Sequence, residues 1–157
     1  MHNIGTKGSE RMSASVKKPK ILIVYPVLTE AENDRFCIDL RVLGYDTYLM
    51  TSVRGLDRDL GATRYAAVII SKAMRDPHHA GSDGYSLASR IKKSKLAMPV
   101  IVLDPTCGNA EDCMRLDTGV RVIPDTARNL EYVLAELFYP ERVERLRIHA
   151  GAIVKEG

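Results

Sequence analysis

The sequence lacks a long apolar run and has few cysteines. No apolar segment approaches the roughly 20 residues that a helix needs to cross a bilayer, and the polar N-terminus lacks the apolar centre of a secretory signal. These absences indicate a cytoplasmic protein that does not enter the membrane. The three cysteines, Cys37, Cys107 and Cys113, include no close pair with the spacing of metal ligands, so we expect neither a zinc site nor a redox site.

A strong excess of positive charge is absent from the central part of the chain, although the formal net charge is +3. Residues 1–20 hold five Lys and Arg against one Asp or Glu, residues 21–140 hold 14 against 16, and residues 141–157 hold four against three. A slightly acidic domain does not predict a nucleic-acid-binding face. Lys17, Lys18 and Lys20 are interpreted as a solubilising tail.

The composition fits one soluble domain with tails. A chain of 157 residues, 45% of them hydrophobic and 27% charged, can bury a core of ordinary size. Residues 1–18 show no periodicity and are predicted to be a disordered tail. Residues 19–140 are predicted to form the domain. Residues 141–157, with Arg142, Arg145 and Arg147 at helical spacing, are predicted to be a solvated helical extension or linker.

Five short apolar segments predict β-strands. The central one is residues 65–71, an uninterrupted apolar run with β-branched residues, which is typical of a strand covered on both faces. Tyr25-Pro26 ends the first strand, because proline has no N–H for the sheet. The predicted strands are residues 20–24, 46–51, 65–71, 98–103 and 120–123.

Capping residues and apolar periodicity predict a helix after each strand. The first helix ends at Gly44, a short second helix spans residues 53–64, a fourth spans residues 109–116, and Pro140 limits the last. The predicted N-terminal caps are Thr29 with Glu32, Ser82 or Asp83, and Thr126. The residues predicted to face the core are Phe36, Leu40 and Leu43 in the first helix, Tyr85, Leu87, Ala88 and Ile91 in the third, and Leu130, Val133, Leu134 and Leu137 in the last.

This alternation of strands and helices predicts an α/β fold of the flavodoxin-like, doubly wound type. We expect a five-stranded parallel sheet with the strand order 2-1-3-4-5 and helices on both faces. Ligands and reacting groups of such sheets lie at the carboxyl ends of the strands. Ser71 ends the central strand, so we expect any functional site to lie close to this residue.

Two stretches resemble the receiver (CheY-like) domain of bacterial response regulators. Residues 83–91 and 98–103 are similar to the third helix and fourth strand of that family, and Gly119 resembles the glycine that closes its fourth helix. The resemblance covers roughly residues 19–140. It implies the flavodoxin-like fold and a role in two-component signal transduction.

The same resemblance implies that the phosphorylation site is degenerate. Tyr25 and Pro26 occupy the positions of the Mg²⁺-binding acids, Ser71 that of the phosphoacceptor aspartate, and Asp104 that of the switch Thr or Ser. The family's lysine before a proline is absent from residues 124–127, where Thr126 lies, and Ile123 takes the place of the aromatic switch residue. Metal, acceptor and neutralising cation are thus all missing. We expect a pseudo-receiver without catalytic residues, bound metal or cofactor.

Two interpretations of this altered pocket remain open. In one, Tyr25, Ser71 and Asp104 close a vestigial pocket by hydrogen bonding. In the other, Asp104 and the long loop after the central strand rebuild a site for a small ligand or anion; the loop residues concerned are Lys72, Asp76, His78 and His79. Neighbouring histidines rarely bind one ion together, so a metal site in this loop is not expected.

A receiver without phosphorylation must act through a surface. We therefore predict a regulatory protein-interaction or dimerisation module, with a protein partner or a second copy as the binding partner. The family's usual contact face would carry Met114, Leu116, Val120, Arg121, Arg128, Glu131, Tyr132 and Glu136. Arg128 and Glu131 would supply opposite charges across a two-fold axis.

Two other functions are compatible with the pattern. Thr51-Ser52, the acid-free strand ending at Ser71 and Asp125-Thr126 resemble, more loosely, the N-terminal wing of pyridoxal-phosphate-dependent ornithine, lysine and arginine decarboxylases. That wing serves assembly, and no cofactor lysine motif is present here. A TIR-like or other nucleotide-processing enzyme would need a glutamate in the helix after the central strand, and residues 85–93 contain none.

Overall fold

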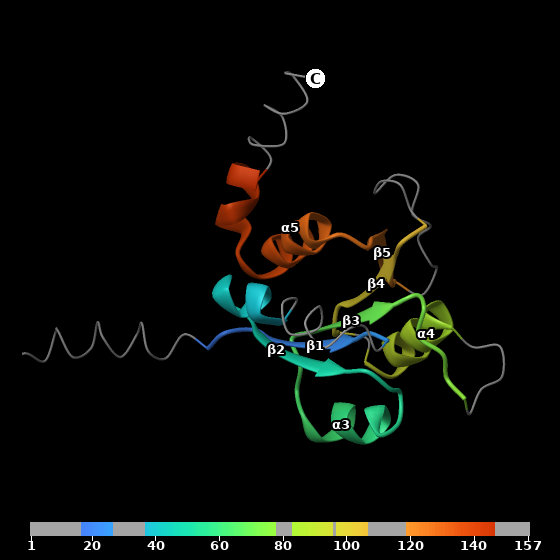
Figure 1. The fold of residues 1–157 in the computed structure, drawn as a ribbon. Coiled ribbons are helices and arrows are strands. Elements are labelled where there is room, and N and C mark those ends of the chain that lie inside the picture. The colour runs from blue at the N-terminus through green and yellow to red at the C-terminus, as the bar shows by residue number, and fades with distance from the viewer. Residues whose placement is uncertain (1–16, 27–36, 78–82, 96, 107–118, 147–157) are drawn as a thin grey trace, which may run out of the picture.

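The computed structural model describes residues 17–26, 37–77, 83–95, 97–106 and 119–146. A five-stranded parallel sheet with the order β2-β1-β3-β4-β5 lies at the centre (Figure 1), so the predicted fold class and strand order are confirmed. Each strand lies within two residues of its predicted bounds. The strands are β1 (Lys20–Val24), β2 (Asp46–Met50), β3 (Ala67–Ser71), β4 (Val100–Asp104) and β5 (Arg121–Pro124).

Strand alternation divides the core into two layers. Ile21 and Ile23 of β1 face one side of the sheet, where they belong to a cluster with Leu40 of helix 37–42 and with α5 (Ala127–Phe138). Leu22 and Val24 face the other side, towards α3 (Leu56–Ala62) and α4 (Gly84–Ser94). Successive side chains of a strand point to opposite faces. The inner strands are therefore apolar except at their ends, where Lys20, Ser71 and Asp104 lie, and helices cover both faces as predicted (Figure 1).

The start of α4 is fixed by two neighbouring residues. The Asp83 carboxylate accepts hydrogen bonds from the backbone N–H groups of Tyr85 (3.1 Å) and Ser86 (3.2 Å), so Asp83 rather than Ser82 is the N-cap. At Gly84, a Cβ atom would overlap the Ser71 carbonyl oxygen and lie 2.7 Å from the Lys72 Cα. Only glycine allows the first turn of α4 to lie this close to the end of β3.

The buried stripe of α5 differs from the prediction at one position. Thr126 caps the helix by accepting from the Asn129 N–H at 3.2 Å, and Leu130 and Leu134 are buried as expected. Leu137, however, is 39% exposed. The next inward position is Phe138, four residues after Leu134, and its ring meets Tyr45 edge to face with centroids 6.3 Å apart.

A second helix, residues 140–146, follows α5 after a break at Tyr139. Arg142, predicted to be solvated, is half-buried: its guanidinium lies 3.9 Å from the centroid of the Tyr139 ring and donates to the Leu43 carbonyl at 2.6 Å. The Tyr139 hydroxyl donates to the Gly44 carbonyl at 2.9 Å. The first part of the predicted C-terminal extension therefore packs against the turn before β2.

The outer side of the edge strand β2 is covered by a side chain from helix 37–42. Asp46 and Met50 form main-chain hydrogen bonds with Pro19 and Tyr25 on the β1 side, so Thr47 directs its main-chain carbonyl outward. The Arg41 guanidinium donates to that carbonyl at 3.1 Å.

Other predicted elements are shorter than expected or lie outside the described residues. The helix predicted at residues 53–64 begins only at Leu56, because Gly55 before it adopts a left-handed conformation with φ of 79°. The Thr29–Glu32 cap, the helix at 109–116, residues 1–16 and residues 147–157 are not described. Among the described helices, none is long and apolar enough to cross a membrane.

Candidate functional site at the carboxyl edge of the sheet

The predicted pocket residues at the strand ends lie along the carboxyl edge of the sheet, towards which the arrowheads in Figure 1 point. Tyr25 follows β1, Ser71 ends β3 and Asp104 ends β4, and these three strands are direct neighbours in the sheet. The structure separates them into two groups, however. Tyr25 and Ser71 continue the alternation that faces α5, whereas Lys72 and Asp104 continue the alternation that faces α4.

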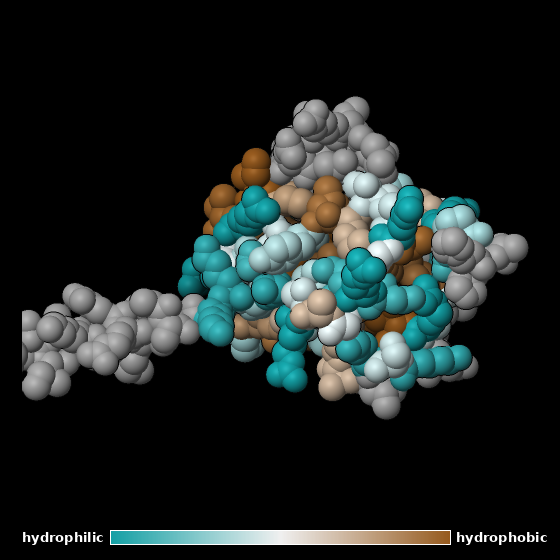
Figure 2. All heavy atoms as spheres, turned by 90° about the horizontal axis from the view of Figure 1, so that it is seen from below, coloured by the Kyte–Doolittle hydropathy of each residue, from teal (hydrophilic) through white to brown (hydrophobic). Residues whose placement is uncertain are grey.

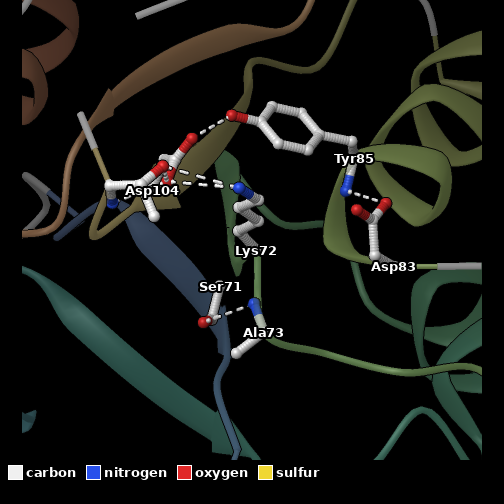
Figure 3. Close-up of polar contacts among 7 residues, drawn as sticks. Ser71, Lys72, Ala73, Asp83, Tyr85 and Asp104 are labelled. Atoms are coloured by element: carbon white, nitrogen blue, oxygen red, sulfur yellow. Dashed lines mark hydrogen bonds and ion pairs between the residues drawn. The ribbon is translucent and has the colours of Figure 1, made fainter.

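The group on the α4 side is a hydrogen-bonded cluster around Asp104 (Figure 3). One carboxylate oxygen, Oδ1, accepts from the Thr106 N–H at 2.8 Å and the Thr106 hydroxyl at 2.6 Å. The other oxygen accepts from the Tyr85 hydroxyl. The Lys72 ammonium lies 3.8 Å from Oδ1 and 5.7 Å from the centroid of the Tyr85 ring. The cluster thereby joins the ends of β3 and β4 to the first turn of α4.

The protonation states in this cluster follow from its contacts. The Asp104 side chain is 5% exposed. Burial alone would raise its pKa, but the hydrogen bonds from Thr106 and Tyr85 and the Lys72 ammonium outweigh burial, so the pKa of Asp104 is lowered. Burial and the hydrogen bond to Asp104 raise the pKa of Tyr85. At neutral pH the site thus holds a carboxylate anion and a neutral phenol that donates to it.

On the α5 side the two polar groups are also engaged. The buried Ser71 hydroxyl oxygen accepts from the Ala73 N–H at 3.1 Å, and Figure 3 shows it pointing away from the Lys72–Asp104 pair. The Tyr25 hydroxyl donates to the Asp125 carboxylate at 2.5 Å. The Ser71 hydroxyl is therefore part of a local turn at the strand end.

The remaining predicted site residues lie elsewhere. Thr126 uses its hydroxyl to cap α5. The Asp76 carboxylate accepts from Arg90 at 3.3 Å, and the same guanidinium binds Asp57 at 3.1 Å. Of the predicted ligand loop, the structure therefore shows Lys72 beside Asp104 and Asp76 beside Arg90, while His78 and His79 lie outside the described residues.

The residues at this edge do not fit the Mg²⁺ ion that the receiver resemblance implies. A hard cation prefers several carboxylate or carbonyl oxygens. The end of β1 offers a phenol and a proline instead, and both oxygens of Asp104 already accept hydrogen bonds. Within the described ranges, no group of three or more His, Cys, Asp and Glu side chains could hold a metal ion.

The predicted dimer face needs one correction. Val120 is only 2% exposed and belongs to the core. It directly precedes β5 and packs with Val122 on the face of the sheet that α3 and α4 cover. Arg121 and Glu136 form an ion pair with each other at 2.9 Å. The other members of this face that the structure describes are Arg128, which is exposed, and Glu131 and Tyr132, which are half-buried; Met114 and Leu116 lie outside the described residues.

Three residues of the site were not predicted as such. Tyr85 was assigned to the core from its helical spacing, and it does pack against the core, but its hydroxyl also reaches Asp104. Thr106 could have been found, because an aspartate often accepts a hydrogen bond from the residue two positions later. Asp125 carries no local signal for its bond to Tyr25, which is 100 positions away in the sequence.

Comparison with known proteins rests on structure alone. No protein family model matches the sequence, and no curated protein matches it. Among solved structures, the response regulator TrrA from Thermotoga maritima, in complex with Mg²⁺-BeF, superposes with a TM-score of 0.59 at 17% identity, over 76% of this chain and 99% of TrrA. The fold is that of a response-regulator receiver domain.

Further receiver domains give the same result. The isolated receiver domain of RcsB from Salmonella enterica serovar Typhimurium, in the presence of phosphomimetic BeF3⁻, has a TM-score of 0.61 at 19% identity, over 83% of this chain and 99% of that one. The non-phosphorylated HemR receiver domain from Leptospira biflexa has a TM-score of 0.56 at 21% identity, over 82% and 94%. Sheet order and helical layers of the receiver fold thus persist here, at identities that support the fold only.

Proposed function

We propose that this chain is a pseudo-receiver, a cytoplasmic, non-enzymatic regulatory domain that binds a protein partner without being phosphorylated. One observation carries the proposal: the anion at the carboxyl edge is the domain's own Asp104, held by Tyr85, Thr106 and Lys72. A phosphoryl group bound beside Lys72 would bring a second anion to a place where this cation already has Asp104 as its counter-ion. At a separation of about 4 Å and an effective dielectric constant of about 20, two like charges repel by about 4 kcal/mol.

The surroundings of Ser71 support the same proposal. A serine acts as a nucleophile when a neighbouring base takes its proton. The Ser71 oxygen instead accepts the Ala73 N–H and is buried at the strand end. Among the two interpretations left open by the sequence, we therefore favour the vestigial pocket over a rebuilt ligand site. The reported structural neighbours do not favour the decarboxylase wing or the TIR-like enzyme.

The test is phosphorylation with a small-molecule donor. The full chain is incubated with acetyl phosphate and Mg²⁺, with the TrrA receiver as a positive control, and intact masses are recorded. We expect the control to gain a phosphoryl group and this chain to keep its mass. A phosphoryl group on this chain, whether acid-stable on Ser71 or acid-labile on a carboxylate, would refute the proposal.

Self-association through α5 is the specific form of partner binding that we propose. Arg128 of one copy would face Glu131 of the second across a two-fold axis, with Tyr132 between them. In sedimentation at micromolar concentration, Arg128→Glu should weaken the dimer, and Arg128→Glu with Glu131→Arg should restore part of it. A wild-type monomer, or a dimer that is indifferent to both changes, contradicts this assignment.

A further inference from the structure

A groove of about 730 Å³ lies at the amino edge of the sheet, at the opposite end of the strands from the carboxyl-edge site around Asp104. It is formed by the end of α3, the segment 63–66 before β3, and Lys95 and residues 97–99 before β4. Its volume falls in the range of roughly 300–1,000 Å³ that is typical of ligand sites. The larger apolar side chains in its lining are Leu60, Tyr65, Met98 and Pro99.

The two charged residues in the lining of this groove are positive, and one carboxylate lies next to it: Asp59 accepts from the hydroxyl of the lining residue Tyr65 at 2.5 Å. Arg64 and Lys95 are exposed, and among the described residues that line the groove they alone carry a formal charge. The Lys92 ammonium donates to the Met98 carbonyl at 2.9 Å, which places a third cation at the same wall. Exposed Lys17 and Lys18 precede β1 at this edge of the sheet. Figure 2, which looks onto the side that carries α3, shows mostly hydrophilic surface with hydrophobic areas between.

The negative ends of two helix dipoles lie near these cations and cancel only part of their positive charge. Both α3 and α4 end at this edge, and the carboxyl end of a helix carries roughly half a negative elementary charge. Two helix ends therefore offset about one of the three cations, Arg64, Lys92 and Lys95, and the Asp59 carboxylate beside Tyr65 offsets roughly one more. A positive surplus of about one charge remains, and the exposed side chains of Arg64 and Lys95 carry it.

Three other grooves lack this combination. The one of about 410 Å³ beside β2 is lined by Arg58 and Asp59, whose charges cancel. The one of about 300 Å³ beside helix 140–146 contains Glu131 together with Arg142 and Arg145, and its Arg142 is bound to Leu43. A further groove of about 660 Å³ on α4 contains Lys93 and Arg90, but Arg90 is paired with Asp57 and Asp76, and the other lining residues are serines. The amino-edge groove is thus distinguished by two exposed cations beside apolar side chains.

We infer that the amino-edge groove binds an acidic segment of a partner protein. Carboxylates of the segment would lie beside Arg64 and Lys95, and an apolar side chain between them would cover Met98 and Pro99. A concave site with a mixed polar and apolar lining and two exposed cations suits a peptide, whose backbone and side chains present both kinds of group. Nucleic acid needs a longer row of cations along its phosphates, and an anionic bilayer needs a more extended basic surface.

The experiment measures binding of a fluorescein-labelled peptide of alternating Glu and Leu to the full chain by anisotropy. We expect saturable binding that weakens as salt is added. The double variant Arg64→Glu/Lys95→Glu should lower the affinity at least roughly fivefold, since each rim charge changes from attraction to repulsion. The matched variant Arg54→Glu/Lys93→Glu makes the same charge change at exposed residues outside the groove and should bind nearly as wild type does.

Several outcomes would overturn the inference. These are an absence of saturable peptide binding, an equal loss in the matched variant, and binding of a short DNA duplex or of phosphatidylserine vesicles, but not of the peptide, that depends on Arg64 and Lys95. Circular dichroism of both double variants shows that they are folded. The inference extends the proposed function to a partner class but can fail separately, because peptide binding and acetyl phosphate labelling are independent measurements.

Discussion

The polar and charged groups at the two edges of the sheet differ in burial and in hydrogen bonding. At the carboxyl edge, Asp104 is buried and accepts hydrogen bonds on both oxygens, and the Tyr25 hydroxyl and the Ser71 oxygen are also engaged. At the amino edge, Arg64 and Lys95 are exposed beside a groove. A receiver fold concentrates its chemistry at the carboxyl edge. We expect the carboxyl edge of this chain to contribute mainly to stability, and the groove that we propose for an acidic segment lies at the other end of the strands.

The largest effect is expected from Gly84→Ala, which breaks the carboxyl edge. The new Cβ would overlap the Ser71 carbonyl, and backbone atoms of β3 cannot move away without disturbing the sheet. We expect a loss of about 3 kcal/mol or more in the free energy of unfolding, measured by urea denaturation. The control is Gly61→Ala in α3, where no atom lies within 4 Å of the added Cβ; it should stabilise by roughly 0.5–1 kcal/mol. Equal stability of the two variants would refute the close approach.

Asp104→Asn should have the second largest effect. The amide keeps the shape but loses the charge that Tyr85, Thr106 and Lys72 surround, so we expect a loss of about 2 kcal/mol at neutral pH. Because the pKa of folded Asp104 is lowered, its stabilisation is present above the unfolded pKa of about 4 and is lost as the pH falls through the folded value. The difference between wild type and variant should therefore shrink in acid. A difference that is independent of pH between neutral and acidic conditions would argue against an ionised, stabilising Asp104.

Arg142→Ala tests the packing of helix 140–146 near the amino edge. It removes the bond to the Leu43 carbonyl and the contact with the Tyr139 ring. We expect a loss of about 1–2 kcal/mol, seen as a lower midpoint of thermal unfolding. Arg145→Ala, an exposed position on the same helix, should stay within about 0.5 kcal/mol of wild type. If both substitutions have the same effect, helix 140–146 is not held by Arg142.

The smallest effects on the free energy of unfolding are expected when one lysine at each edge of the sheet is replaced. Lys72→Met removes a cation that is 35% exposed and 3.8 Å from Asp104, and should cost about 0.5–1 kcal/mol after allowance for solvent screening. Lys95→Met at the amino edge should change the free energy of unfolding by less than about 0.5 kcal/mol. Urea denaturation of both variants in one buffer gives the comparison. A larger loss for Lys95→Met would show that the amino edge, too, uses its cations for stability.

The sequence predicted the sheet well because each strand is a local apolar run. Residues 20–24 and 65–71 are continuous apolar runs, so both faces of these strands must be covered to bury their side chains. This requirement holds independently of the rest of the sequence. Ser71 and Asp104 were also placed correctly at the strand ends. Their partners depend on how far α4 approaches β3 and on where β1 and β5 lie across the sheet. No local sequence pattern determines these distances. The hydrogen bonds of Tyr85 to Asp104 and of Tyr25 to Asp125 were therefore not predicted.

The errors at Val120 and Leu137 have a similar cause. Both are apolar residues at the margin of an element, where a shift of one position changes which side of the structure a residue faces. Val120 was assigned to the surface and is buried, and Leu137 was assigned to the core and is exposed. The partner of α5 at that level is the ring of Tyr45, which comes from a distant part of the chain and selects Phe138.

The contact between Arg41 and the Thr47 carbonyl has a consequence for how this protein behaves at high concentration. An edge strand with free main-chain groups is a template on which another molecule can add a strand, and repeated addition leads to aggregation. The guanidinium of Arg41 occupies one of the acceptors that such a strand would need, and it brings a positive charge that a second copy would also carry. Arg41 thereby protects β2 against the growth of the sheet from one molecule into the next.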